Sequence, residues 1–169
     1  FDVVVADNVI HGFQSSGGSS VNQAGVISYG TRRSVFEHNH IYDVTHGMQI
    51  KGHELWGFEI RFNHVHDVTD FMRIHGMLEG PEGEVSTIRQ NLVERFTRAF
   101  EFTTSATQVG EPDGVVVAHN LFIEQRGSAY GVLWLVVDPL EDGAVPRNIR
   151  FFNNVMADIE GGQLGSNFD

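Results

Sequence analysis

Apolar residues recur in a fixed pattern around six asparagines that are spaced along the whole chain. These are Asn8, Asn39, Asn63, Asn91, Asn120 and Asn154. The position three residues before each asparagine and the position two residues after it are apolar in all six segments. Polar and apolar residues alternate around these positions, as in 58–62, and helical periodicity is absent. The pattern therefore predicts short β-strands throughout the chain.

The segment 39–52 is followed by a near copy of itself at 63–76, with eight of fourteen positions identical at an offset of 24 residues. We expect three short strands in each repeat: one that ends before the asparagine, one directly after it, and a third such as 71–75. Asparagine tolerates left-handed backbone angles, and its side chain can bond to the backbone or to an asparagine stacked about 4.8 Å away. Repeats of this kind predict a solenoid, in which each turn packs only on its neighbours.

The asparagine ladder and its two apolar columns resemble the right-handed parallel β-helix proteins of the pectate-lyase-like superfamily. The fold class that follows is all-β: a right-handed, single-stranded parallel β-helix of about six coils, forming one domain over residues 1–169. An antiparallel sandwich with regular turns is the alternative that the turn spacing alone allows. We expect the chain to be a fragment of a longer protein. Further coils or a partner chain would then cover its open ends.

Composition narrows the classes of function. The chain has 169 residues, is 41% hydrophobic and contains no cysteine, which excludes disulfides and thiolate metal sites. Its formal charge of −11 argues against a nucleic-acid partner, which needs a basic surface. No apolar run approaches the roughly 20 residues of a membrane span. We predict a secreted or cell-surface protein.

The two copies differ at positions predicted to point away from the core. Methionine and isoleucine of each Met-x-Ile segment are expected to point inward, so the residues between and after them face solvent. The predicted outward face comprises Gln49, Lys51, Arg73, His75 and Glu101, joined by Trp134 in the register in which Leu133 and Leu135 point inward, with His46 and His53 at its margins. Loops at 77–84, 103–114 and 136–146 are expected to wall this face, and 14–23 forms a second insertion.

A basic and imidazole cluster on an acidic protein suits an acidic polysaccharide. Arginine or lysine can neutralise a uronate carboxylate, which makes the neighbouring C5 proton easier to remove, while a base takes that proton. Lys51 or His75 is the candidate base, and Arg73 or His75 is the candidate carboxylate ligand or acid. Four further residues are predicted to bind substrate, the last as an aromatic platform: Gln49, His53, Glu101 and Trp134. A solvated face without catalysis is the alternative reading of the same residues.

The same segment resembles the chondroitinase B and alginate lyase family of β-helix enzymes. That family places a catalytic lysine near the end of one strand and an arginine of an Arg-His-Gly motif on the next coil. Lys51 matches the lysine, whereas 73–76 reads Arg-Ile-His-Gly, so His75 takes the place of the arginine. Val44 and His46 stand where the family has calcium-binding carboxylates. We therefore predict no cofactor, because Ca²⁺ lacks a clear ligand set.

Seven of the nine histidines lie between residues 38 and 75. His40, His64 and His66 are predicted to point outward on the second strand, and imidazoles in this arrangement can bind zinc, copper or nickel. Asp43 and Asp67 fall where the strand turns, so no carboxylate is placed as a further ligand. We predict no metal site.

Together these patterns predict a polysaccharide-active protein, and specifically a lyase that cleaves a uronic-acid-containing polymer by β-elimination. The competing hypothesis is a non-catalytic stalk, adhesin or glycan-binding surface protein built on the same fold.

Overall fold

The computed structural model is built from β-strands and connecting segments. It describes residues 3–13, 23–52, 55–75, 81, 84–103, 114–127, 132–136, 148–160 and 165–166. The part of the chain described in this way contains no helix, and hence no helix long and apolar enough to cross a membrane.

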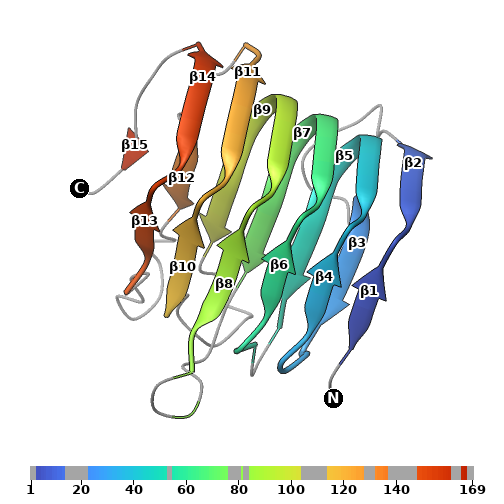
Figure 1. The fold of residues 1–169 in the computed structure, drawn as a ribbon, viewed down its shortest axis with the longest axis vertical. Helices are drawn as coiled ribbons and strands as arrows, with labels where there is room; N and C mark the ends of the chain where they lie inside the picture. Colours follow the sequence, from blue (N-terminus) through green and yellow to red (C-terminus); the bar gives the residue numbers. More distant parts are fainter. Residues whose placement is uncertain are drawn as a thin grey trace.

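One sheet is formed by the strands that precede the asparagines, which lie parallel and side by side (Figure 1). In spatial order they are β1 (Val4–Ala6), β4 (Val35–Glu37), β6 (Glu59–Arg61), β8 (Ser86–Arg89), β10 (Val115–Ala118) and β13 (Arg150–Phe152). Spatial order follows sequence order, and every neighbouring pair in this sheet is parallel.

The strands that follow the asparagines form the second sheet. They are β2 (Val9–Phe13), β5 (His40–Lys51), β7 (His64–His75), β9 (Leu92–Thr103), β11 (Leu121–Gln125) and β14 (Val155–Ile159). Three further strands extend it: β3 (Ala24–Tyr29), β12 (Leu133–Val136) and β15 (Gly165–Ser166). β2 pairs with the first half of β5 and β3 with its second half.

The prediction of three short strands per repeat is therefore wrong in the middle of the chain. There β5, β7 and β9 are each one strand of 12 residues that serves as both the second and the third strand of a turn. The all-β parallel solenoid itself is confirmed, because each turn of the chain adds one strand to each sheet.

The asparagine ladder is also confirmed, and Asn63 shows how it works. The backbone N–H and the side-chain Nδ2 of Asn39 both donate to Oδ1 of Asn63 at 3.0 Å. Nδ2 of Asn63 in turn donates to the carbonyl oxygen of Phe36 and to Oδ1 of Asn91, both at 2.9 Å. Asn39, Asn63 and Asn91 are buried. The ladder therefore satisfies buried polar groups on successive turns, as buried polar groups require.

Left-handed backbone angles do occur at this corner, but not at the asparagines. They fall on the residue before each one, including the bulky Phe62 with a φ of 55°. A second column of left-handed residues lies within the second sheet, at Asp43, Asp67, Arg95, Glu124 and Asp158. Non-glycine residues rarely adopt such angles. Their recurrence at equivalent positions marks two corners of the solenoid.

The core lies inside the solenoid, where the inward side chains of both sheets meet. Ile60 and Ile88 come from the first sheet and Val65 and Val93 from the second, and all four are fully buried. Several aromatic side chains join them: Phe36, Phe58, Phe71, Phe96, Phe100, Phe102 and Phe122. Burial of such apolar surface is the main stabilising contribution to the fold.

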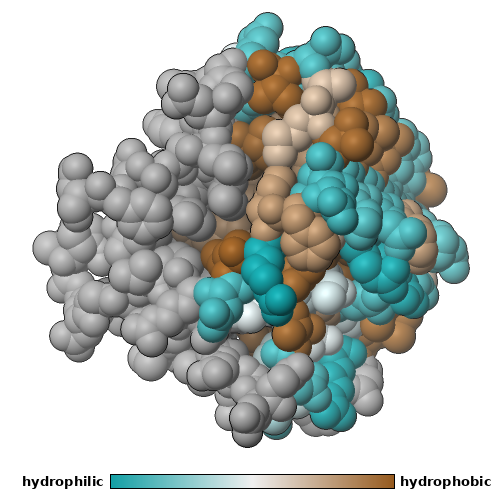
Figure 2. Space-filling model, turned by 60° about the vertical axis from the view of Figure 1, so that its left-hand side comes forward, coloured by the Kyte–Doolittle hydropathy of each residue, from teal (hydrophilic) through white to brown (hydrophobic). Residues whose placement is uncertain are grey.

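Both ends of the described solenoid expose apolar side chains. Val4 and Val9 are each 65% exposed at one end, and Phe152, Val155 and Met156 are exposed at the other. Figure 2, in which the side of the C-terminal strands is turned forward, shows hydrophobic residues gathered between the teal surface and the grey segments.

Candidate functional site

The backbone register brings the predicted site residues together on the second halves of the long strands. Gln49 pairs with Arg73, Arg73 with Glu101, and Glu101 with Trp134. Lys51 pairs with His75 in the neighbouring column. These residues alternate with members of the core, so their side chains leave the sheet on its outer side. The structure describes only the backbone of Trp134, and His53 lies outside the described residues.

The expectation that this face is open to solvent is wrong. Gln49 is 2% exposed, Glu101 5% and Lys51 6%, while Arg73 and His75 are only half-buried. The face thus has a low-dielectric environment, in which unpaired charges are costly and paired ones interact strongly. The loops predicted to wall it, at 77–84, 103–114 and 136–146, fall almost wholly outside the described residues, as does 14–23.

A chain of ion pairs crosses this face from one strand to the next. Both carboxylate oxygens of Asp70 accept from Arg98, at 2.5 and 2.9 Å, and one also bonds to Nδ1 of His46 at 2.6 Å. Arg98 also reaches Glu101 at 2.8 Å. Glu101 accepts two hydrogen bonds from Arg73, at 3.0 and 2.6 Å. Two carboxylates, two guanidinium groups and one imidazole are thus linked to one another, which lowers the cost of burying them.

Asp70 and Arg98 are central to this network, although sequence reasoning did not identify them. Phe71 and Met72 are consecutive residues that both belong to the core, so the alternation of the strand breaks between them. The break puts Asp70 on the same side as Arg73, where strict alternation does not place it. Burial opposes ionisation of Asp70, but hydrogen bonds from His46 and Arg98 outweigh it and lower the pKa of its carboxyl group. Asp70 therefore holds His46 as a buried carboxylate–imidazole pair.

His75 differs from the other members of this cluster. Its Nε2 atom is buried and has no hydrogen-bond partner among the residues that the structure describes. Burial is the largest cause that lowers the pKa of His75 to about 4, and the positive charges of Arg73 and Lys51 contribute in the same direction. At neutral pH the imidazole is therefore uncharged. A neutral imidazole with an unengaged ring nitrogen beside two cations has the properties of a general base for an anionic substrate.

Lys51 is the only lysine in the chain. Its Nζ atom lies 4.7 Å from the centre of the Tyr29 ring, which is 57% exposed on the neighbouring strand β3. A cation over the face of an aromatic ring is attracted by the ring quadrupole. Tyr29 thus helps to hold the ammonium group at the end of the column that also contains His75.

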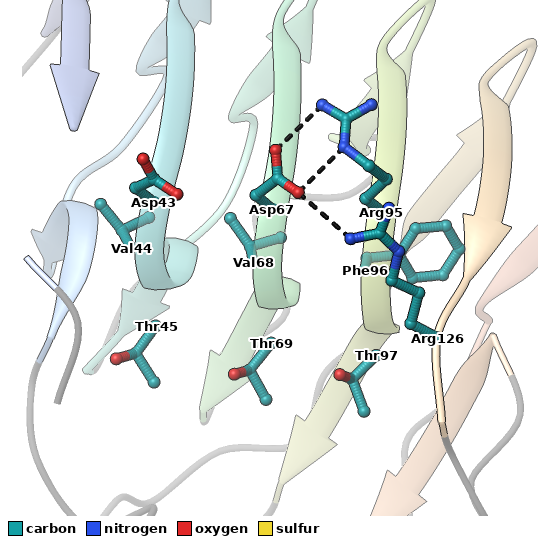
Figure 3. A pocket seen from close by; sticks show the side chains of 10 residues that line it. All are labelled: Asp43, Val44, Thr45, Asp67, Val68, Thr69, Arg95, Phe96, Thr97 and Arg126. Atoms are coloured by element: carbon teal, nitrogen blue, oxygen red, sulfur yellow. Dashed lines mark hydrogen bonds and ion pairs between the residues drawn. The ribbon is translucent and has the colours of Figure 1, made fainter. Parts of the chain in front are cut away.

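A pocket of about 380 Å³ lies elsewhere, at the bend of the long strands. Figure 3 shows its rows of equivalent side chains: Asp43 and Asp67, Val44, Val68 and Phe96, then Thr45, Thr69 and Thr97, with Arg95 and Arg126 at one side. Arg95 donates two hydrogen bonds of 2.9 Å to Asp67. These bonds are the largest cause that lowers the pKa of Asp67 to about 2; burial opposes them and the contact with His66 adds to them.

Sequence reasoning missed this pocket, although the repeated Asp-Val-Thr at 43–45 and 67–69 was a signal for it. Its threonine hydroxyls, carboxylates and guanidinium groups are the kinds of group that hydrogen-bond to sugar hydroxyls.

The three histidines predicted to point outward on the second strand lie in contact with one another. His40 and His64 stack with ring centres 4.9 Å apart, and Nε2 of His40 lies 2.8 Å from Nε2 of His66. Burial, followed by the charges of His64, His66 and His11, lowers the pKa of His40. The structure adds a carboxylate that sequence reasoning did not place there, because Oε2 of Glu94 lies 2.6 Å from Nε2 of His64.

No protein-family model matches the chain, and no curated protein or solved structure shows significant similarity to it.

Proposed function

We propose that the chain is a polysaccharide lyase that cleaves a uronic-acid-containing polymer by β-elimination. The observation that supports this most is the neutral His75 beside Arg73 and Lys51, whose Nε2 has no hydrogen-bond partner within the described part of the chain. The proposal includes a right-handed helix of about six coils and a secreted or cell-surface location. Further coils or a partner chain would cover the exposed apolar residues at the two ends.

In the proposed reaction, Arg73 and Lys51 bind the uronate carboxylate and stabilise the negative charge that develops on it. Nε2 of His75 removes the C5 proton, and the electrons of that bond form the double bond between C4 and C5. The bond from C4 to the glycosidic oxygen then breaks. The oxygen leaves with a proton returned by the imidazolium of His75. An anionic carboxylate next to His75 raises its pKa towards neutrality, because it offsets the two cations that lower it.

The test is an ultraviolet assay for the unsaturated uronyl product on alginate, pectate, chondroitin and dermatan. We expect product from one of these polymers. His75→Gln and Lys51→Ala should each lower kcat by about 100-fold or more, the usual range for a lost acid–base group. His119→Gln is the matched control, since it removes an exposed histidine on a turn outside this cluster.

Two outcomes contradict the proposal, the first its lyase activity and the second its assignment of His75 as the base. One is the absence of product from every polymer while circular dichroism shows a folded chain. The other is activity that His75→Gln leaves unchanged, which would place the base elsewhere.

The alternative is a non-catalytic glycan-binding protein, and a specific observation favours it too. The charged groups of the cluster already pair with one another, Asp70 with Arg98 and Glu101 with Arg73. The pocket at the bend offers polar groups independent of that cluster. Binding of an oligosaccharide without turnover, weakened by Thr69→Val in the pocket but not by His75→Gln, would support this function instead.

A further inference from the structure

A second site lies on the first halves of the long strands, away from the proposed catalytic cluster. His40 belongs to β5, His64 and His66 to β7, and Glu94 to β9. His40 pairs with His64, and His66 pairs with Glu94, so the four residues occupy two adjacent columns on three successive turns. One ligand atom from each of the three histidines lies within 4.8 Å of the other two.

The close approach of His40 and His66 restricts where their protons lie. Their Nε2 atoms are 2.8 Å apart, which leaves room for one proton between them. At least one of these nitrogens therefore directs a lone pair at the other. A metal ion could replace that proton and accept the lone pairs of both nitrogens.

The ring of His66 is held in the orientation that a metal ligand needs. Its Nδ1 lies 2.7 Å from Oδ2 of Asp67 and 2.9 Å from a guanidinium nitrogen of Arg95. These contacts compete, because Nδ1 cannot donate to the carboxylate and accept from Arg95 at once. We assign the proton to Nδ1, since a bare lone pair facing an ionised carboxylate is repulsive and Arg95 already bonds to Asp67. A carboxylate on one ring nitrogen with the other free is the usual outer shell of a metal-bound histidine.

Aromatic stacking fixes the remaining rings. The Tyr42 ring lies parallel to His66, with centres 5.0 Å apart and an angle of 6° between planes. His40 and His64 stack with an angle of 3°. Glu94 supplies the carboxylate at 2.6 Å from Nε2 of His64. The side chain of His64 is 38% exposed and that of Glu94 25%, so an ion can enter from solvent.

We infer that His40, His64, His66 and Glu94 form a binding site for Zn²⁺. Three imidazoles and one carboxylate match the nitrogen and oxygen ligands and the fourfold coordination that this ion prefers. Ligand atoms of a tetrahedral zinc site lie about 3.3 Å apart at bond lengths of about 2.0–2.1 Å. The three imidazole ligand atoms lie within 4.8 Å of one another, and the side chain of Glu94, which contacts His64, would have to turn to complete the set. The ion would cross-link three successive turns of the solenoid through side chains alone.

The test is calorimetric titration of the chelator-treated 169-residue chain with zinc sulfate. We expect one Zn²⁺ per chain at micromolar affinity or tighter, and a melting temperature that rises with zinc concentration. Cobalt(II) in place of zinc should give the intense visible absorption of a four-coordinate ion. His66→Gln should weaken binding about tenfold or more and abolish the thermal shift, and Glu94→Gln should weaken it as well.

His119→Gln is the control, because it also removes one histidine but from an exposed turn outside the cluster. It should bind zinc as the unaltered chain does. Circular dichroism of the metal-free variants separates loss of the site from loss of the fold. The inference is overturned if zinc produces neither heat nor a thermal shift, or if folded His66→Gln binds as tightly as the unaltered chain. It does not depend on lyase activity.

Discussion

A ladder asparagine satisfies polar groups on three successive turns at once. Asn63 accepts from the backbone and side chain of Asn39, donates to Phe36 and Arg61 carbonyls, and donates to Asn91. Removing its side chain therefore leaves several buried groups without partners. The cost of an unmade buried hydrogen bond exceeds the gain from a made one.

We predict that Asn63→Ala lowers the free energy of unfolding by about 3 kcal/mol or more, since it leaves more than one buried polar group unpaired. Asn8→Ala is the matched control. Asn8 is exposed, so water replaces its lost bonds, and the change should cost about 1 kcal/mol or less. Urea denaturation of both variants measures the difference. Equal losses of unfolding free energy in the two variants would mean that burial does not increase the contribution of a ladder asparagine.

His75 makes stability depend on pH in a defined window. Its pKa is about 4 in the folded chain, against 6.5 for the ordinary side chain. Between these values the unfolded chain binds the proton and the folded chain does not, so stability falls as the pH falls through that window. We predict that this group makes the chain about 2 kcal/mol less stable at pH 5 than at pH 7.

Urea denaturation at pH 7 and pH 5 measures this contribution as a difference from His75→Gln, which cannot titrate. The variant should lose about 2 kcal/mol less on acidification than the unaltered chain. Identical pH dependence in the two proteins would show that His75 is protonated as readily in the folded state as in the unfolded one.

At the scale of the element, the long strands β5, β7 and β9 contain no proline, and there is little space between the backbones of neighbouring turns. Gly47 lies at the bend of β5 between His46 and Met48, and it aligns with Phe71 on β7. A Cβ atom at Gly47 would lie 2.7 Å from the carbonyl oxygen of Phe71 and 2.8 Å from Cγ1 of Val65. The carbonyl belongs to the backbone of a buried strand, so it cannot rotate away.

We predict that Gly47→Ala costs about 3 kcal/mol, at the upper end for overpacking of a core. Ala99 belongs to the same column on β9, and Ala99→Gly is the control: it removes a methyl group without adding contacts and should cost about 1 kcal/mol. Thermal or urea denaturation of the two variants compares them. A neutral Gly47→Ala would show that the turns of the solenoid can separate locally.

At the scale of the whole molecule, the fold could be predicted from the sequence more completely than the site could. The fold was predictable because its asparagine ladder and apolar columns repeat in every turn, and the register of Gln49, Arg73 and Glu101 follows from that repeat. The site was less predictable because it depends on departures from the repeat. The break in alternation at Phe71–Met72 is not marked by a turn-forming residue. Because of this break, the side chain of Asp70 points into the charged network.

The carboxylate of Glu94 beside the three histidines was also missed. Glu94 follows Asn91 by three residues, as His66 follows Asn63, so its place beside His66 was readable from the repeat. The diagonal contact with His64 was not, because it depends on the direction of both side chains. The burial of Gln49, Lys51 and Glu101 could not be predicted from the sequence either, because it depends on all the residues that surround the outer face.

The single lysine has a consequence for labelling the protein. Because Lys51 is the only lysine and its side chain is 6% exposed, amine-directed reagents find one protected target within the chain. Reductive methylation with carbon-13 formaldehyde would place one isotopic probe there and another on the α-amino group, whose lower ordinary pKa distinguishes its signal. The resonance of the Lys51 probe would report, in one signal and without any substitution, when an anion approaches the face that Lys51 shares with His75.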